Sequence, residues 1–471
     1  MKDKYNLEFE EDIPKYLQIA NHIKNLIENK KIKDMEKLPT IREYCEFLDV
    51  NKITIINCYK KLVSDGFAYQ KMGSGTYAKR KESVSSFKKV YSNSFKELTS
   101  KNNTKNVIDF AGETYGKIIF PMEDFKAIIN AVLNRDGEEA LIAQNPLGYE
   151  ELRQTINNVF WKNKLKLDDI LIVTGAQQGI DVASKAILNI NDNVVVEKPT
   201  YGGALSVFKF RRANVFEVDI ENDGINLKKF EEILKKNRIK CFYTMSYFQN
   251  PTGVSYSIEK KKKIIELAKE YDFYIIEDDY LSELIYDKNI EYIPFKKLDK
   301  YDRVIYIKSF SKVFLPGIRL GYIVSPNKYK DIIRNTKFNT DIATSSLMQR
   351  ALEMYIKDGK WIDNIENLKK IYNERYNLIT NLIDEKLGDM VEYNKPGGGI
   401  SLFLTLKKDI ITSRKLFMKL KEKGVYITPG VLFFKDIKDG DMSFRIGFSQ
   451  TEKKQIEEGI NIIKEELECR I

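Results

Sequence analysis

The spacing of apolar and polar residues along the chain predicts two folded parts joined by a polar stretch. Residues 14–30 carry apolar side chains at helical spacing, and further helical and strand-like segments follow up to residue 78. From residue 107 onward, short apolar runs alternate with helical segments, which is the pattern of an α/β fold. Between them the chain is polar and basic, without a clear period. We therefore predict a small domain at 5–78, a linker at 79–106 and a larger domain at 107–471.

The small domain has the pattern of a helix-turn-helix followed by a β wing. Thr40, with Glu43 three positions later, predicts a capping box that opens a helix ending near residue 48. A second helix is expected over residues 52–64, with an inner face formed by Ile53, Ile56, Tyr59, Leu62 and Val63. Residues 66–78 predict two strands around a turn. This order of elements, an α+β winged helix-turn-helix, would bind DNA through its second helix. On helical spacing alone, a packing module of helices is the favoured interpretation.

Predicted strands of the larger domain end at groups that can bind a phosphorylated ring. Gly175, Ala176 and Gln177 follow a strand and open a helix, which places backbone N–H groups at a phosphate, although an ordinary turn looks the same. Tyr201 follows the next strand and could stack on a flat ring or belong to the core. Asp278 ends a third strand, where its carboxylate could keep a pyridine nitrogen protonated, cap the strand or bind a metal.

The segment from Ser309 to Gly321 carries the most distinctive chemistry. It follows an apolar run at 303–307 that predicts a buried strand. Lys312, at the end of that strand, can act as an amine nucleophile toward a carbonyl cofactor. Hydroxyl groups and a planar guanidinium lie close by in sequence and could bind a phosphate, namely Ser309, Ser311 and Arg319. Taken alone, the segment would also fit a solvated surface loop.

Together these segments resemble the fold-type I aminotransferases of class I/II, which use pyridoxal 5′-phosphate (PLP). The resemblance includes Asn250-Pro251-Thr252-Gly253, Asp278-x-Tyr280 and the segment around Arg445, in the order of the family. It implies that Lys312 is the Schiff-base lysine, that Asp278 and Tyr280 act with it, and that Arg445 binds a substrate carboxylate. It further implies a large α/β domain with a small C-terminal lobe from about residue 347, and a cofactor bound by Gly175, Ala176, Gln177, Tyr201, Asn250, Asp278, Tyr280, Ser309, Ser311, Lys312 and Arg319.

The small domain resembles the GntR-type winged helix-turn-helix. The likeness rests on Leu38-Pro39-Thr40-Ile41-Arg42, on Thr54 and on the wing turn Gly73-Ser74-Gly75-Thr76. It implies DNA contacts from Arg42, Lys52, Thr54, Ser74 and Thr76. The second helix of this family usually opens with Ser-Arg-x-Thr. In this chain Lys52 takes the arginine's place and can neutralise a phosphate, but it lacks the bidentate geometry that reads guanine.

Both halves together resemble the MocR-type regulators. That resemblance implies a PLP-dependent transcription regulator that senses an amino compound by external aldimine formation on the Lys312-bound cofactor. It also implies a homodimer, arranged head-to-tail as in such regulators, on a double-stranded DNA operator. Two alternatives stay open: an active aminotransferase that carries a DNA-binding domain, and a regulator that senses PLP itself.

Composition excludes several other classes. The chain has 471 residues and no apolar run near ~20 residues, so we expect neither a membrane span nor a signal peptide. We therefore expect a cytoplasmic protein. Its four cysteines lie far apart and His22 is its single histidine, so we expect no metal site. The net charge of +10 permits a nucleic-acid partner without requiring one.

Overall fold

The computed structural model has two compact units, Met1–Asn102 and Asn103–Ile471. The structure describes residues 3–468, apart from residues 8, 11–12, 30, 72, 80–86, 88, 95–106, 114–118, 120 and 408–410. Most of the predicted linker, residues 79–106, therefore lies outside the described residues.

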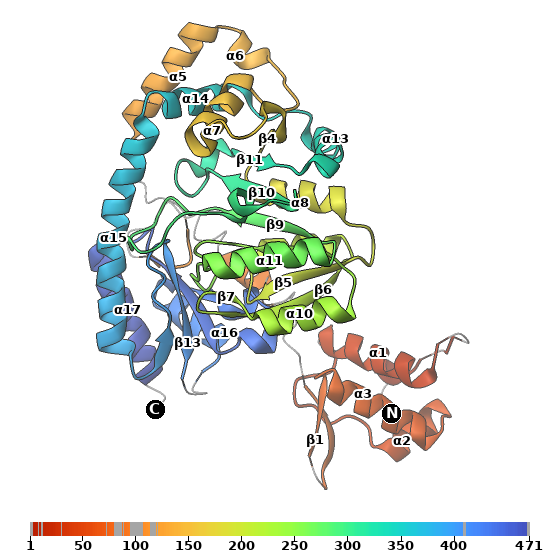
Figure 1. Ribbon diagram of the computed structural model, residues 1–471. Helices are drawn as coiled ribbons and strands as arrows, with labels where there is room; N and C mark the ends of the chain where they lie inside the picture. The colour runs from red at the N-terminus through yellow and green to blue at the C-terminus, as the bar shows by residue number, and fades with distance from the viewer. Residues whose placement is uncertain are drawn as a thin grey trace. The chain divides into compact units, whose positions relative to one another are not determined.

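The first unit has the predicted winged helix-turn-helix (Figure 1). Its elements are η1 (Asp3–Tyr5), α1 (Lys15–Glu28), α2 (Ile41–Leu48), α3 (Lys52–Ser64) and the antiparallel wing strands β1 (Ala68–Lys71) and β2 (Gly75–Ala78). The capping box is confirmed: the Glu43 N–H donates to Thr40 Oγ1 at 3.2 Å, and the Thr40 N–H donates to Glu43 Oε2 at 3.0 Å. These two bonds fix the start of α2.

The predicted inner face of α3 is partly wrong. The buried positions are Ile55, Cys58, Tyr59 and Leu62, which recur at helical spacing and pack into the core of this unit. Ile53 is 63% exposed and Val63 is 38% exposed. The apolar positions of α3 exceed what one face can bury, so sequence alone could not fix the rotation of the helix. Packing against α1 fixes it and leaves Ile53 on the surface beside Lys52.

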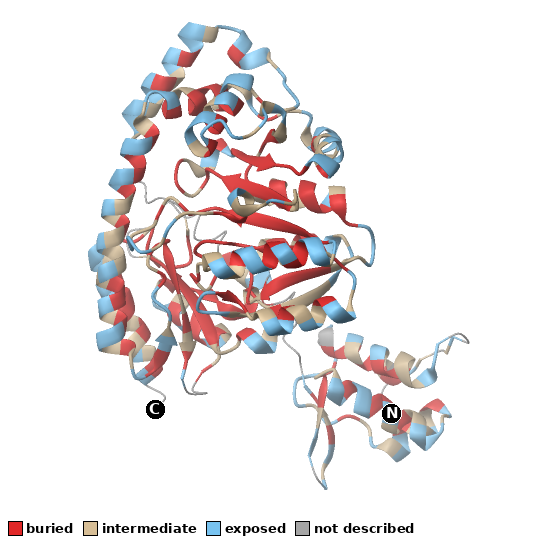
Figure 2. Cartoon of the chain, in the orientation of Figure 1, coloured by how far each residue is buried: buried red, intermediate tan, exposed pale blue. Residues whose placement is uncertain are grey.

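The second unit is built on an eight-stranded mixed sheet in the order β4-β11-β10-β9-β8-β5-β6-β7. The strands from β10 to β6 are parallel, whereas β11 and β7 pair antiparallel with their neighbours. Their bounds are β4 (Ile170–Val173), β5 (Asn193–Lys198), β6 (Asn214–Glu221), β7 (Gly224–Ile225), β8 (Ile239–Thr244), β9 (Tyr274–Asp279), β10 (Val304–Ser309) and β11 (Gly321–Val324). The central strands are buried throughout, as their colour in Figure 2 shows.

Helices cover both faces of this sheet. One face packs against α10 (Leu227–Lys236), α11 (Ile258–Glu270) and α12 (Phe295–Leu298), through a core that includes Phe230, Ile264 and Phe295. On the other face lie α8 (Ala176–Ile187) and α9 (Gly202–Phe210). A Cβ added at Gly179 of α8 would lie 2.7 Å from Ile307 Cγ2, so this glycine permits the close approach of α8 to β10. The parallel strands therefore end between two helical layers, where ligands bind in open α/β sheets.

Some of the remaining elements form a small C-terminal lobe, and the others lie around the large sheet. The lobe has a four-stranded antiparallel sheet in the order β12-β13-β16-β15, formed by Val391–Tyr393, Ser401–Leu406, Ser443–Gly447 and Thr428–Pro429. Beside it lie α16 (Ser413–Glu422), α17 (Lys453–Glu468) and the parallel pair β3 (Ile108–Asp109) and β14 (Val425–Tyr426). The long α15 (Lys360–Leu387) packs along α17 (Figure 1). The other elements are α5 (Met122–Asp136), α6 (Glu139–Ile142), α7 (Glu150–Trp161), η2 (Leu167–Asp169), η3 (Pro316–Ile318), η4 (Asn327–Tyr329), α13 (Lys330–Asp341), α14 (Ser346–Lys357), η5 (Gly430–Leu432) and η6 (Ile437–Gly440).

Candidate cofactor and ligand site

Three successive acidic residues end β9, and strand geometry separates them. Side chains alternate across a strand, so Asp278 points to the face that α8 covers, whereas Glu277 and Asp279 point to the opposite face. Their hydrogen bonds agree with this division. Glu277 accepts from the backbone N–H groups of Phe295 and Lys296, next to α12. Of the three carboxyl groups, that of Asp278 is thus available on the α8 face of the sheet.

The Asp278 carboxyl has one paired and one unpaired oxygen. Oδ2 accepts a hydrogen bond from the Tyr243 hydroxyl at 2.8 Å. Oδ1 is buried and has no hydrogen-bond partner among the described residues. Burial raises the pKa of Asp278 to about 7, because the charged form is poorly solvated. An oxygen in this condition fits a donor such as a protonated pyridine nitrogen, which would stabilise the carboxylate.

The turn before α8 forms a cradle with two polar side chains. Gly175 has φ = +98° and precedes the first turn of the helix, where unpaired backbone N–H groups favour an anion. A Cβ built on Gly175 would lie 3.4 Å from Arg319 Nη2 and 3.6 Å from Ser311 Oγ. The Ser311 hydroxyl is buried and has no hydrogen-bond partner among the residues described. Guanidinium, hydroxyl and helix terminus together fit a phosphate group.

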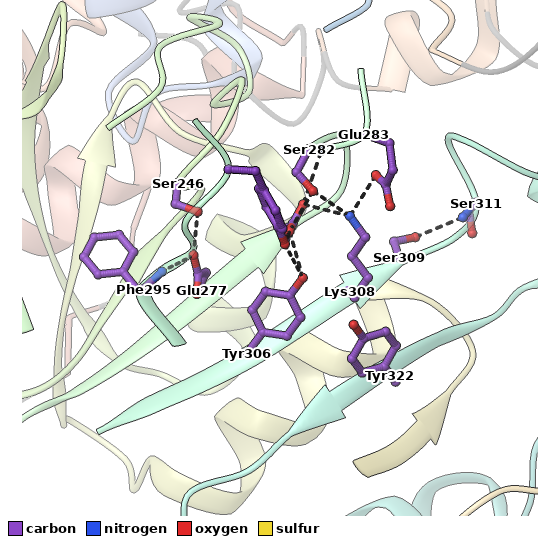
Figure 3. A network of polar contacts seen from close by, with 12 residues as sticks. Ser246, Glu277, Ser282, Glu283, Phe295, Tyr306, Lys308, Ser309, Ser311 and Tyr322 are labelled. Carbon is purple, nitrogen blue, oxygen red and sulfur yellow. Dashed lines mark hydrogen bonds and ion pairs between the residues drawn. The ribbon is translucent and has the colours of Figure 1, made fainter. Parts of the chain in front are cut away.

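The other predicted phosphate residues contribute differently. Ser309 Oγ accepts the Ser311 N–H at 3.3 Å and so helps to fix the turn (Figure 3). Arg319 adopts a left-handed conformation with φ = +51°, and its Nη2 donates to the Thr174 carbonyl at 3.1 Å. Both residues therefore hold the cradle in shape, and direct phosphate contacts from them stay a prediction.

Two lysines of this segment have very different surroundings. Lys308, on β10, is 2% exposed and donates to Asp279 at 3.0 Å, Ser282 at 2.9 Å and Glu283 at 2.8 Å. Figure 3 shows this side chain directed into the polar network, with Tyr306 nearby. All three protons of its ammonium group are thus engaged. Lys312 is 26% exposed, and Glu113 at 3.4 Å is its one polar partner among the described residues. Of the two lysines, Lys312 has the amine that is free to react.

Arg445 is linked to Lys312 through Glu113, which pairs with both, and it is held by several further partners. Its Nη1 donates to Asn250 Oδ1 at 2.7 Å and forms an ion pair with Glu113 Oε1 at 2.5 Å. Its Nη2 donates to the Ala111 carbonyl and to Thr428 Oγ1, both at 3.3 Å. Asn250 and Arg445, which the sequence predicts as separate ligand-binding residues, are thus in direct contact.

The two predicted tyrosines are buried nearby. The Tyr201 hydroxyl donates to Gln177 Oε1 at 3.1 Å, and burial raises the pKa of Tyr201 to about 12. The Tyr280 hydroxyl donates to the Phe248 carbonyl at 2.9 Å. Burial first, then the charge of Glu113, raises the pKa of Tyr280 well above its ordinary value. Tyr280 therefore stays neutral, and its contact with the cofactor oxygen stays a prediction. Ala176 is the first residue of α8.

The structure also shows partners that the sequence did not indicate. Tyr243 on β8, Glu113 after β3 and Thr428 on β15 each touch a predicted site residue. They come from strands or loops far apart in the chain, so no local motif marks them. The alternation of β8 was the one available signal, because it places Tyr243 on the same face as Asp278.

The predicted DNA-contacting residues lie on α2, α3 and the wing of the first unit. Arg42 is 89% exposed and pairs with Glu46 on its own helix. Lys52 is exposed at the start of α3, and Thr54 is partly exposed in the first turn of the same helix. In the wing, the Ser74 and Tyr77 hydroxyls lie 2.6 Å apart, whereas Thr76 is 7% exposed. The Thr76 side chain is thus the least accessible of the five, and all five contacts stay predictions.

The second unit has the fold of the fold-type I, PLP-dependent aminotransferases, and a winged helix-turn-helix precedes it. Comparison with protein families gives the same result. Residues 114–463 match aminotransferase class I and II, and residues 15–78 match the gntR family of bacterial regulatory proteins. The chain therefore belongs to the class I and II aminotransferase family and carries a GntR-type DNA-binding domain. The enzymes of this fold are PLP-dependent.

Individual relatives fall into two groups. Aromatic-amino-acid aminotransferase 1 of Thermococcus litoralis is 31% identical over 79% of this chain and 91% of its own. The uncharacterized HTH-type transcriptional regulator YdfD of Bacillus subtilis is 26% identical over 95% of both chains. Among solved structures, the Pyrococcus horikoshii kynurenine aminotransferase has a TM-score of 0.75 and 30% identity, covering 81% of this chain and 94% of its own.

The regulators match both units of the chain, which is the MocR-type arrangement. The aminotransferases match about four-fifths of it. Among the residues that the structure describes, no helix is long and apolar enough to cross a membrane. In the same described part, no cluster of metal-binding side chains occurs.

Proposed function

We propose that this chain is a transcription regulator that binds PLP through Lys312 and senses an amino compound in the same pocket. The observation that carries the proposal is the pair of buried oxygens without a partner among the described residues, Asp278 Oδ1 and Ser311 Oγ, together with the Lys312 amine. They match the two polar ends of the cofactor, its ring nitrogen and its phosphate. The GntR-type domain in the same chain gives such a pocket a regulatory output.

Each residue has a distinct part in this proposal. When bound, PLP supplies an aldehyde that reacts with amines and a ring that withdraws electrons. Gly175, Ser311 and Arg319 bind the phosphate and so fix the position of the ring. Asp278 accepts a hydrogen bond from the protonated ring nitrogen at Oδ1, the buried oxygen that has no partner among the described residues. The Lys312 amine holds the cofactor, and Tyr201 packs on the ring.

Signal transfer requires that the ligand distinguish between two conformations of the protein. An amine that binds both equally well would not change DNA affinity, however tightly it binds. We propose that ligand binding favours a closed small lobe and that the linker passes this change to the DNA-binding domains. We also propose a two-fold homodimer, arranged head-to-tail, because a two-fold dimer would read paired half-sites of an operator.

The absorption spectrum of the PLP-loaded protein tests the cofactor and ligand parts together. We expect a visible band in the wild type that is absent in Lys312→Ala, and a lasting change of that band with one member of an amine panel. A band that is unchanged in Lys312→Ala would contradict the assignment. A band that no amine changes, with DNA affinity that follows PLP concentration, would favour a regulator that senses PLP itself.

An active aminotransferase is the second candidate. It is supported by the likeness to named aminotransferases and by Glu113, which pairs with both Lys312 and Arg445. Asp278 and Arg445 both influence the pKa of the same tyrosine, Tyr201. Addition of a 2-oxo acid after the amine separates the two functions. Repeated turnover would establish an aminotransferase, and a band that stays changed would support a sensor.

A further inference from the structure

Glu113 places a carboxylate of the protein itself in the pocket. Its side chain is 9% exposed, and its two oxygens are directed to two different cations. Oε1 pairs with Arg445 Nη1 at 2.5 Å, and Oε2 pairs with Lys312 Nζ at 3.4 Å. Asn250 Nδ2 lies 3.5 Å from Oε1. Burial opposes the charged form, but Arg445 and then Lys312 outweigh it and lower the pKa of Glu113. The group is therefore an anion at neutral pH.

The hydrogen bonds of Arg445 leave little room for a second anion. Its two terminal nitrogens carry four protons and have four acceptors: Glu113, Asn250, the Ala111 carbonyl and Thr428. The remaining donor, Nε–H, is buried and has no partner among the described residues. A carboxylate that binds a guanidinium in the usual two-point manner needs two neighbouring N–H groups. Both terminal nitrogens become available to it only if an existing acceptor leaves.

Of these four acceptors, Glu113 is the one that carries the same group and the same charge as a ligand carboxylate. Asn250, Ala111 and Thr428 are neutral, so a carboxylate that displaced them would lie beside the Glu113 charge. If the ligand carboxylate takes the place of Glu113, the Arg445 guanidinium still binds one anion, but the contact between Glu113 and Lys312 is lost. The gain from the ligand's carboxylate is thus largely offset by the loss of an equivalent internal contact.

We propose that Glu113 is an internal competitor for Arg445, which makes the pocket discriminate against amino acids and favour amines that lack an α-carboxylate. This inference rests on the proposed function, since it concerns ligands that react in the Lys312 pocket. Glu113 is then a specificity-determining residue. An amine without the carboxylate binds with the Glu113–Arg445 pair intact. An amino acid must first displace it.

The test compares two ligands that differ only by the carboxylate, L-2-aminobutanoate and propylamine. Dissociation constants are measured from the visible absorption change of the PLP-loaded protein, for the wild type and for Glu113→Gln, which keeps the size of the side chain. We expect the preference for the amino acid over the amine to rise by roughly 10- to 100-fold in Glu113→Gln. Glu392→Gln, an exposed change on β12, is the matched control and should leave the preference unchanged.

A double variant, Glu113→Gln with Arg445→Gln, separates competition from other effects. If Glu113 acts through Arg445, the gain for the amino acid disappears in the double variant. Thermal unfolding of the cofactor-free proteins gives a second readout: L-2-aminobutanoate should raise the melting temperature of Glu113→Gln more than that of the wild type. Equal preferences in wild type and Glu113→Gln, or tighter binding of both ligands alike, would overturn the inference. If the wild type has no cofactor band, the proposed function itself fails, and the inference fails with it.

Discussion

Asp278→Asn should change how the stability of the cofactor-free protein depends on pH. Burial raises the pKa of Asp278 from 3.8 to about 7 in the folded protein. Between these values the folded protein binds a proton that the unfolded chain has lost, so the free energy of unfolding falls as pH rises. An asparagine cannot titrate, and the variant lacks this contribution.

The size of the effect follows from the two pKa values. With 3.8 in the unfolded chain and about 7 in the folded protein, Asp278 removes about 2.5 kcal/mol of stability between pH 5 and pH 8. Burial also raises the pKa of Glu197 and of Glu277 to about 7. Glu197 contributes alike to both proteins. The charge of Glu277 also raises the pKa of Asp278, so loss of the Asp278 charge lowers the pKa of Glu277 and adds to the gain of the variant.

The assay is denaturant unfolding of the second unit, monitored from pH 5 to pH 8 without PLP. From pH 5 to pH 8, we expect the free energy of unfolding of Asp278→Asn to rise by about 2.5 kcal/mol relative to that of the wild type. This change does not depend on how much the two proteins differ at pH 5. Asp389→Asn, an exposed change after α15, is the control and should run parallel to the wild type. Parallel curves for Asp278→Asn and the wild type would show that the pKa of Asp278 is not raised in the folded protein. Added PLP should reverse the order at pH 8, because the wild type gains more stability from the cofactor.

Three further predictions concern single contacts. Borohydride reduction of the PLP-loaded protein should attach the pyridoxyl group permanently to Lys312, which peptide mass spectrometry detects. A pyridoxyl group on Lys308, whose ammonium protons are all hydrogen-bonded, would contradict the assignment of Lys312. Gly175→Ala should weaken PLP binding by about tenfold or more in equilibrium titration, because its methyl group would lie between Ser311 and Arg319; unchanged affinity would exclude the cradle. Lys52→Ala should weaken DNA binding and lower the slope of log affinity against log salt by about 1 per contact; an unchanged slope would exclude a phosphate contact.

The sequence predicted most of the architecture because its signals are local. Strand and helix periods, the Thr40 capping box and the wing turn each lie within a few residues. The strand pattern also predicted that Gly175, Asp278 and Lys312 follow or end strands, and β4, β9 and β10 belong to one sheet. Parallel strands bring such ends to one edge.

The features that the sequence does not predict depend on contacts between segments that are far apart in the chain. The rotation of α3, with Ile53 exposed, is fixed by α1 and not by the helix itself. Glu113 and Arg445 are more than three hundred residues apart in the sequence, and the residues around each of them give no sign that the two form an ion pair. Charge pairing of this kind is decided by tertiary packing, which a hydrophobic period does not encode.

We propose that occupancy of the site at Lys312 controls DNA binding, and DNA affinity measures this control directly. The PLP-loaded wild type is titrated onto DNA fragments that flank its own gene, with and without the amine that changes its spectrum, and Lys312→Ala serves as the control. We expect the amine to change the dissociation constant of the wild type for DNA by roughly fivefold or more, the usual range of coupling between sites, and to leave that of Lys312→Ala unchanged. An equal dissociation constant with and without the amine, at a concentration that saturates the spectral change, would contradict it.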